Sequence, residues 1–227
     1  MDYPWSYDEL TQTVSIHPNF NEKLTGLPVD TKTIIFPQSL SIFDCPIKKN
    51  NLPPNVQRIE FGDSFNQPVS EDNLPSNITH LTFGNFFNQR IYTLPNSITH
   101  LSFSHFFNQR IYTLPNSITH LTFGIYFNQP ITKGLLPNSL THLTFGSGFN
   151  QSVVSLPNSL ISLTFKGSIS NQLLDTLPMN LTHLSLGSLY GKELNNLPCS
   201  LKILEMPEYY PIEKIKLPFG CKVITKN

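Results

Sequence analysis

The chain has 227 residues, and its 15 Lys and Arg residues balance 15 Asp and Glu residues, so the net charge is zero. Only 13% of the residues are charged, which argues against DNA or RNA binding because that requires a basic excess. No apolar run approaches the roughly 20 residues of a membrane span, and residues 1–20 lack the basic start and apolar core of a signal peptide. Three scattered cysteines are too few for a disulfide framework or a zinc cluster. We therefore expect a soluble protein of a reducing compartment, in the cytoplasm.

A repeating pattern begins at Phe20, and the residues before it include three aromatic side chains, Tyr3, Trp5 and Tyr7. The terminal coils of a repeat protein need altered faces, because one side of each has no neighbour to cover it. We therefore assign residues 1–19 to an N-terminal cap.

Residues 20–205 consist of one short unit that recurs. Residues 86–101 and 106–121 are identical, and successive Leu-Pro pairs lie 20 to 25 residues apart. The pairs begin at Leu27, Leu52, Leu74, Leu94, Leu114, Leu136, Leu156, Leu177, Leu197 and Leu217. A period of about 20 residues is typical of solenoid proteins, in which each unit stacks on the next.

Each unit predicts a short strand, a sharp turn and an extended return. Leu101 and Phe103 alternate with His100 and Ser102, as in a strand of period two. The strand is followed by Gly or Ser, where the chain turns, and the proline of the Leu-Pro pair excludes a helix interior in the return. The sequence therefore predicts a β-rich, leucine-rich-repeat-like solenoid of about ten coils. One parallel sheet of short strands would form its concave face, opposite extended or irregular convex returns with few helices.

The repeat changes character towards the C-terminus. The recurring Phe-Asn pair becomes Ser170-Asn171, then Tyr190-Gly191, then Tyr210-Pro211, and charged residues become more frequent after Lys192. We assign residues 206–227 to a C-terminal repeat and cap.

The asparagine of the Phe-Asn pair forms a column along the solenoid. An inward amide offers two donors and an acceptor oxygen to the backbone groups of a turn, and can bridge to the next coil. We interpret this column as a structural ladder. It comprises Asn66, Asn88, Asn108, Asn128, Asn150 and Asn171, with Asn21 and Asp44 in the first units.

Strand alternation places two polar columns on the solvent side of the sheet. Five of the seven histidines share one column, and a hydroxyl column lies two residues further along each strand. These candidate partner-binding residues are His80, His100, His120, His142 and His183, with Thr82, Ser102, Thr122, Thr144, Thr164 and Ser185.

Three interpretations of the histidine column stay open. It is a polar ladder that belongs to the repeat itself, a protein-binding surface, or a metal- or pH-responsive element. Parallel imidazoles disfavour a metal site because zinc needs convergent ligands, whereas crowded histidines without carboxylates should resist protonation. A regular hydroxyl column also suggests an ice- or carbohydrate-binding face, which we disfavour because strand twist spoils a flat lattice.

Charge placement argues against an enzyme. Between Asn73 and Leu174 there is no Asp or Glu, so this span offers no carboxylate pair for glycoside hydrolysis and no third member of a Ser-His-Asp triad. We expect no catalytic residues, no bound metal and no cofactor.

The stretch Ile-Thr-His-Leu-Thr-Phe-Gly, followed by Phe-Asn-Gln and a Leu-Pro pair, resembles the FNIP repeat, a member of the leucine-rich-repeat class. The match is close in the units that start at Leu74, Leu94, Leu114 and Leu136, and the resemblance covers roughly residues 20–226. It implies an open solenoid that binds proteins, of a kind found in social amoebae and giant DNA viruses. Many such proteins carry an F-box, for which residues 1–19 are too short.

From these observations we expect a non-enzymatic scaffold that binds an unidentified protein, and neither nucleic acid nor membrane. If the source is viral, it would act on host proteins in the host cytoplasm. The alternatives are metal- or pH-responsive binding through the histidine column and, more weakly, a ubiquitin-ligase substrate adapter that lacks its F-box. The oligomeric state is left open.

Overall fold

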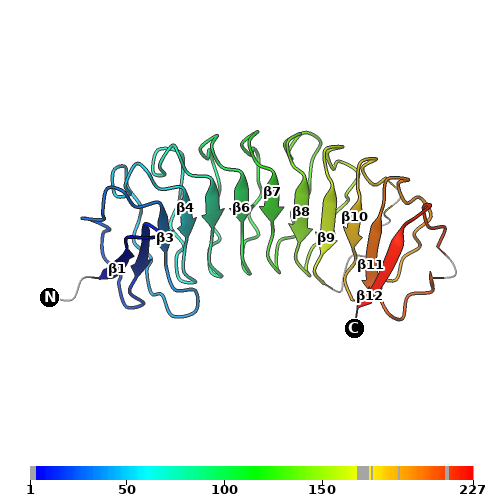
Figure 1. Ribbon diagram of the computed structural model, residues 1–227, viewed down its shortest axis with the longest axis horizontal. Coiled ribbons are helices and arrows are strands. Elements are labelled where there is room, and N and C mark those ends of the chain that lie inside the picture. The colour runs from blue at the N-terminus through cyan, green and yellow to red at the C-terminus, as the bar shows by residue number, and fades with distance from the viewer. Residues whose placement is uncertain (1–3, 168–173, 175, 189, 213–214, 227) are drawn as a thin grey trace.

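The computed structural model describes residues 4–167, 174, 176–188, 190–212 and 215–226. Twelve strands form one sheet in which the spatial order follows the chain order (Figure 1). The strands are β1 Trp5–Asp8, β2 Thr13–Ile16, β3 Thr33–Ile35, β4 Arg58–Glu60, β5 His80–Thr82, β6 His100–Ser102, β7 His120–Thr122, β8 His142–Phe145, β9 Ser162–Phe165, β10 His183–Ser185, β11 Ile203–Pro207 and β12 Lys222–Lys226. The described residues contain no α-helix, and therefore none long and apolar enough to cross a membrane.

The coils stack in parallel from β2 to β12, and together they form a curved row (Figure 1). This architecture confirms the predicted leucine-rich-repeat-like solenoid. The register pairs identical repeat positions, for example His100 with His120 and Leu101 with Leu121. Because every strand is in this register, a residue type that recurs in the sequence becomes a straight column in space.

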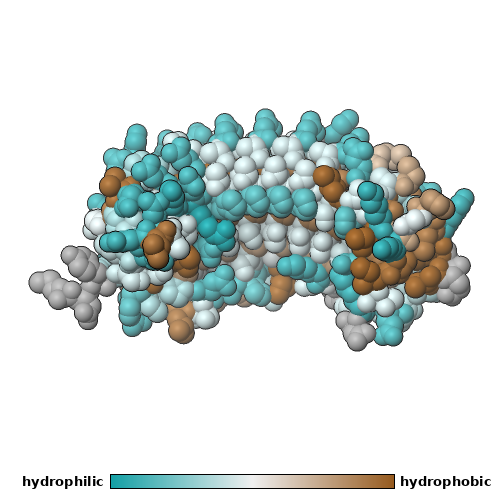
Figure 2. Space-filling model, viewed as in Figure 1, coloured by the Kyte–Doolittle hydropathy of each residue, from teal (hydrophilic) through white to brown (hydrophobic). Residues whose placement is uncertain are grey.

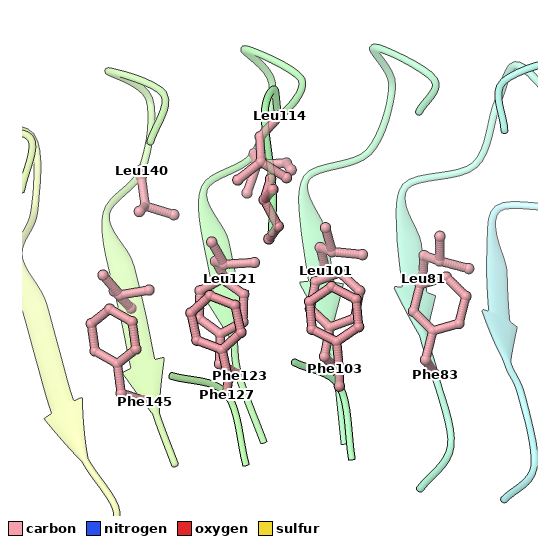
Figure 3. Close-up of a cluster of buried hydrophobic side chains, with 14 of the residues drawn as sticks. Leu81, Phe83, Leu101, Phe103, Leu114, Leu121, Phe123, Phe127, Leu140 and Phe145 are labelled. Atoms are coloured by element: carbon pink, nitrogen blue, oxygen red, sulfur yellow. The ribbon is translucent and has the colours of Figure 1, made fainter. Parts of the chain in front are cut away.

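Two columns of phenylalanine rings fill the interior of the coils. Phe103 stacks on Phe123 of the next coil at 5.8 Å between ring centroids, and on Phe107 of its own coil at 3.9 Å. In Figure 3 the rings of Phe83, Phe103, Phe123 and Phe145 lie in one row, one per strand, with Leu81, Leu101 and Leu121 beside them. Burying each such side chain contributes roughly 1.5–3 kcal/mol, which a coil obtains only when its neighbours cover its two sides.

The asparagine column links each coil to the next through backbone and side-chain hydrogen bonds. Asn88 Oδ1 accepts from the backbone N–H of Asn108 at 3.0 Å and from Gln109 Nε2 at 3.2 Å. The same backbone bond recurs at Asn66, Asn108 and Asn128, where Oδ1 accepts from Asn88, Asn128 and Asn150. These asparagines are half-buried or exposed and bridge each coil to the next, and Asn171 lies outside the described residues.

The two ends of the solenoid differ from its middle. At the N-terminal end, β1 pairs antiparallel with β2, so the segment expected to cap the solenoid includes a hairpin. Asp8 fixes its turn by accepting from the backbone N–H of Leu10 at 2.9 Å and from Thr11 Oγ1 at 2.8 Å. At the C-terminal end β12 continues the parallel sheet, so residues 206–227 include one further strand of the repeat.

Candidate partner-binding surface

The sheet has one face directed away from the phenylalanine core, here called the sheet face. The predicted histidine column lies on it, since His80, His100, His120 and His142 are paired in register across β5 to β8. Ser162 of β9 separates these four from His183. Figure 2 shows a hydrophilic stripe that crosses the middle strands of this face, with paler bands on both sides.

The four consecutive imidazoles stack on one another and form what we call the histidine ladder: His80, His100, His120 and His142. Their ring centroids are 4.2 Å apart at each of the three steps, and the planes of neighbouring rings differ by 14° or less. The first three are half-buried and the fourth is exposed. The rings are therefore held parallel, with their edges directed to solvent.

The threonine that precedes each histidine holds the ring in place. Thr99 Oγ1 lies 3.2 Å from the carbonyl oxygen of Thr79 and 2.9 Å from His100 Nδ1. The hydroxyl and Nδ1 therefore share a hydrogen bond whose donor is set by the tautomer of the ring. The same pair of bonds recurs at Thr79, Thr119 and Thr141. The ladder thus presents a row of parallel imidazoles that can form hydrogen bonds with whatever contacts the sheet face.

The environment of the ladder favours neutral rings. Burial lowers the pKa of His80, His100 and His120 below the ordinary value of 6.5, and the positive charges of neighbouring imidazolium rings lower it further. Arg58, in the next strand of the sheet, adds to the effect on His80 and His100. No carboxylate is among the causes that act on these three rings.

The hydroxyl column runs beside the ladder, and most of it is half-buried: Thr82, Ser102, Thr122, Thr144 and Thr164. Ser185 departs from the prediction because it is buried at 7% exposure and accepts a hydrogen bond from Lys226 Nζ at 2.8 Å. Lys226 also pairs with Glu205, which occupies the next position of the column. The C-terminal strand therefore covers this end of the column and removes Ser185 from the accessible surface.

A groove of about 460 Å³ follows the hydroxyl column at the point where the strands end. One wall consists of Thr82, Ser102 and Thr122, and turn residues such as Asn85, His105 and Ile125 line it as well. Asp63 and Lys166 also border it. The groove gives the sheet face a depression along which an extended ligand can lie.

An exposed aromatic row that the sequence pattern did not lead us to expect lies next to this groove. Phe86, Phe106 and Tyr126 are 43–54% exposed, and their rings stack at 5.3 and 5.1 Å from one coil to the next. Two adjacent aromatic residues precede the asparagine in these units, and the second of them fills the core. The pair of adjacent aromatic residues could have indicated the exposed row, because two consecutive residues of an extended segment face opposite sides. If the second residue is buried, the first is directed to solvent.

The described residues contain no group of three or more His, Cys, Asp or Glu side chains placed to hold a metal ion. In the ladder the parallel rings direct their lone pairs side by side, whereas a zinc ion needs ligands that converge at about 2.0–2.1 Å. The two ion pairs of the described chain, Arg58–Glu60 and Lys226–Glu205, lie beyond the ladder at either end. The sheet face thus offers a row of hydrogen-bonding groups with a groove beside it.

Comparison with known protein families identifies the repeat. A model of the FNIP repeat matches residues 43–86, 87–126, 107–148, 127–168 and 171–209. The chain belongs to the FNIP-repeat family. No curated protein matches this FNIP-repeat chain.

Among solved structures, the FNIP-repeat chain is similar to CroV588, described as a novel circular LRR protein structure from a giant virus. The two are 38% identical with a TM-score of 0.78, over 94% of this chain and 36% of CroV588. The chain thus spans little more than a third of the length of that protein. A second similar structure is YopM from Yersinia enterocolitica, with 18% identity, a TM-score of 0.43, and coverage of 88% of this chain and 51% of YopM.

Proposed function

We propose that this FNIP-repeat chain is a non-enzymatic scaffold that binds another protein through the sheet face of β5 to β8. The observation that carries the proposal is the histidine ladder, four parallel, partly or fully exposed rings stacked at 4.2 Å in a regular row. Binding loses less conformational entropy when the contacting groups are already fixed, and here the Thr–His bonds fix each ring.

The groove and the aromatic row support the same face as a binding surface. Protein interfaces are enriched in aromatic residues and depleted of charge at their centre, and the middle strands combine exposed rings at Phe86, Phe106 and Tyr126 with a ladder free of carboxylates. Likeness to CroV588, a giant-virus protein, supports a viral origin. Action on a host protein in the cytoplasm is part of the proposal.

The experiment is affinity capture with two triple variants. His100→Ala, His120→Ala and His142→Ala together remove three rings of the ladder, while Asn96→Ala, Asn116→Ala and Asn138→Ala remove three exposed amides from the units that carry those histidines. We expect the histidine variant to lose the captured protein and the asparagine variant to retain it, with both showing the wild-type circular dichroism spectrum. Equal capture by both variants would exclude the ladder as the binding surface.

A second candidate function is a response to pH, which the lowered pKa values of His80, His100 and His120 favour. When the rings are protonated, both ring nitrogens become donors and the row becomes positively charged. NMR titration of the imidazoles, with and without zinc, tests this candidate and the metal-binding alternative. If the rings titrate independently near the ordinary pKa, the pH-responsive function is excluded. If zinc does not change the titration, the metal-binding alternative is excluded as well.

A further inference from the structure

Charge is distributed unevenly along the solenoid. Residues 74–174 contain no Asp or Glu and four basic residues, Arg90, Arg110, Lys133 and Lys166. Residues 1–73 contain ten acidic residues and only five basic ones. The net charge of the chain is zero, but the middle segment is positively charged because its basic residues have no acidic neighbours in the sequence.

Two of these cations lie side by side on the outside of the solenoid, away from the sheet face. Arg90 and Arg110 hold the same repeat position in consecutive units, two residues after Asn88 and Asn108, and both are exposed. In the described chain neither forms an ion pair with a carboxylate. Two exposed tyrosines accompany them, Tyr92 at 61% and Tyr112 at 69% exposure. We call these four residues the arginine–tyrosine patch.

The patch is partly ordered before any partner arrives. The guanidinium carbon of Arg110 lies 5.7 Å from the ring centroid of Tyr112, a cation–π contact that restricts the long side chain. A pocket of about 250 Å³ opens beside Arg90, and its lining residues are Pro68, Asn88, Gln89, Arg90, Tyr92 and Gln109. One cation, three amides and a phenol line this pocket, without any carboxylate.

We propose that the arginine–tyrosine patch binds an extended acidic segment of a protein, whose Glu and Asp side chains pair with Arg90 and Arg110. A guanidinium presents two parallel N–H donors that match a carboxylate, and two arginines one coil apart, about 4.8 Å along the sheet direction, form a short row of such forks. The surface is distinct from the sheet face, so this binding does not depend on the function proposed above.

The surroundings also orient the segment. Glu71 lies at the N-terminal border of the patch, since its backbone N–H donates to the carbonyl of Thr93 at 2.9 Å. Its carboxylate and that of Asp72 repel an acidic ligand there, whereas Lys133 attracts it from the next coil. The segment therefore runs from Arg90 towards Lys133.

A carboxylate-rich protein segment fits the patch better than a nucleic acid. Binding to a phosphate backbone relies on many cations and a positive field, whereas this chain has no net charge and its first 73 residues are acidic. A long polyanion that contacts Arg90 and Arg110 also comes close to the carboxylates of the N-terminal coils, which repel it.

The test is fluorescence anisotropy with the intact chain and a fluorescein-labelled peptide of alternating Glu and Gly. The peptide has about 10 residues and spans roughly 33 Å when extended, and binding is measured at about 10 mM salt, where the Debye length is roughly 30 Å. We expect the Glu peptide to bind more tightly than a matched Gln peptide. We also expect R90Q/R110Q to weaken it roughly 5- to 10-fold, as two exposed ion pairs imply.

Two controls make the result specific. K23Q/K49Q removes the same charge from exposed positions in the acidic N-terminal coils and should leave the affinity within about twofold. The histidine triple variant should bind the peptide as the wild type does, which separates this surface from the sheet face. The inference is overturned if the Glu peptide binds no better than the Gln peptide, if R90Q/R110Q binds it as tightly as the wild type, or if a single-stranded oligonucleotide binds more tightly.

Discussion

The middle coils and the terminal coils share the same repeat but differ in how the polar side chains of the sheet face are paired. On the sheet face of β5 to β8, identical side chains stack into a ladder of imidazole rings whose Nδ1 atoms bond to threonine hydroxyls. At β4 and at β11 the hydroxyl position holds Glu60 and Glu205, each paired with a cation. Where the repeat is regular, in the middle, the sheet face carries a regular row of stacked rings. Where the repeat changes, towards the ends, ion pairs take the place of the ladder.

The core should show the largest difference between the two regions. Phe103→Ala removes a ring that packs against rings of its own coil and both neighbouring coils, and we expect the free energy of unfolding to fall by about 3–5 kcal/mol. Phe20→Ala, at the N-terminal end, removes a half-buried ring that stacks on Phe43 at 6.0 Å and should cost clearly less. Urea unfolding measures both, and equal losses would mean that the middle is not packed more tightly than the end.

The asparagine column should show an intermediate effect. Asn88→Ala removes an oxygen that accepts from the backbone of Asn108 and from Gln109, and we expect a loss of about 0.5–1.5 kcal/mol because the link between the two coils is broken while water can replace the exposed partner. Asn88→Asp keeps the accepting oxygen, as Asp44 does for Asn66 in an earlier coil, and should retain most of the stability. If the two variants unfold alike in urea, the amide oxygen is not what links the coils.

The smallest effect should come from pH. The folded-state pKa of His80, His100 and His120 is lowered, so the unfolded chain binds protons more readily, and the stability present above pH of about 6.5 declines as the pH falls through that value. We expect a lower Tm at pH of about 5.5 than at pH of about 7.5, a range in which ordinary carboxylates remain ionised.

The matched variant for this measurement is H100N/H120N, which removes two of the three shifted groups and should show a smaller decline in Tm. A wild-type Tm that is constant or rises on acidification would show that the ladder does not resist protonation.

Much of this structure could be predicted from the sequence because the repeat fixes the register. The period of the Leu-Pro pairs and the alternation around Leu101 were enough to predict the parallel solenoid and to place the histidines in one column. The same alternation separates Leu101 and Phe103 from His100 and Ser102, and the side chains of Leu101 and Phe103 are buried.

Other features depend on side-chain torsions or on contacts between distant coils, which a periodic pattern does not contain. The stacking of the rings and their bonds to threonine depend on torsions such as the one that brings the Thr99 hydroxyl to His100 Nδ1 and to the Thr79 carbonyl of the preceding coil. The burial of Ser185 depends on Lys226, 41 residues further along the chain. The β1–β2 hairpin arises outside the repeat, where no period constrains the backbone.

Site-specific photo-crosslinking tests most directly whether the middle of the sheet face is the binding surface. A photoreactive residue is placed at Thr122 of β7 in one variant and at Ser15 of β2 in another, both on the sheet face. We predict that the captured partner crosslinks to position 122 and not to position 15. Crosslinking from position 15 alone, or from neither position while the partner is still captured, would contradict the proposal.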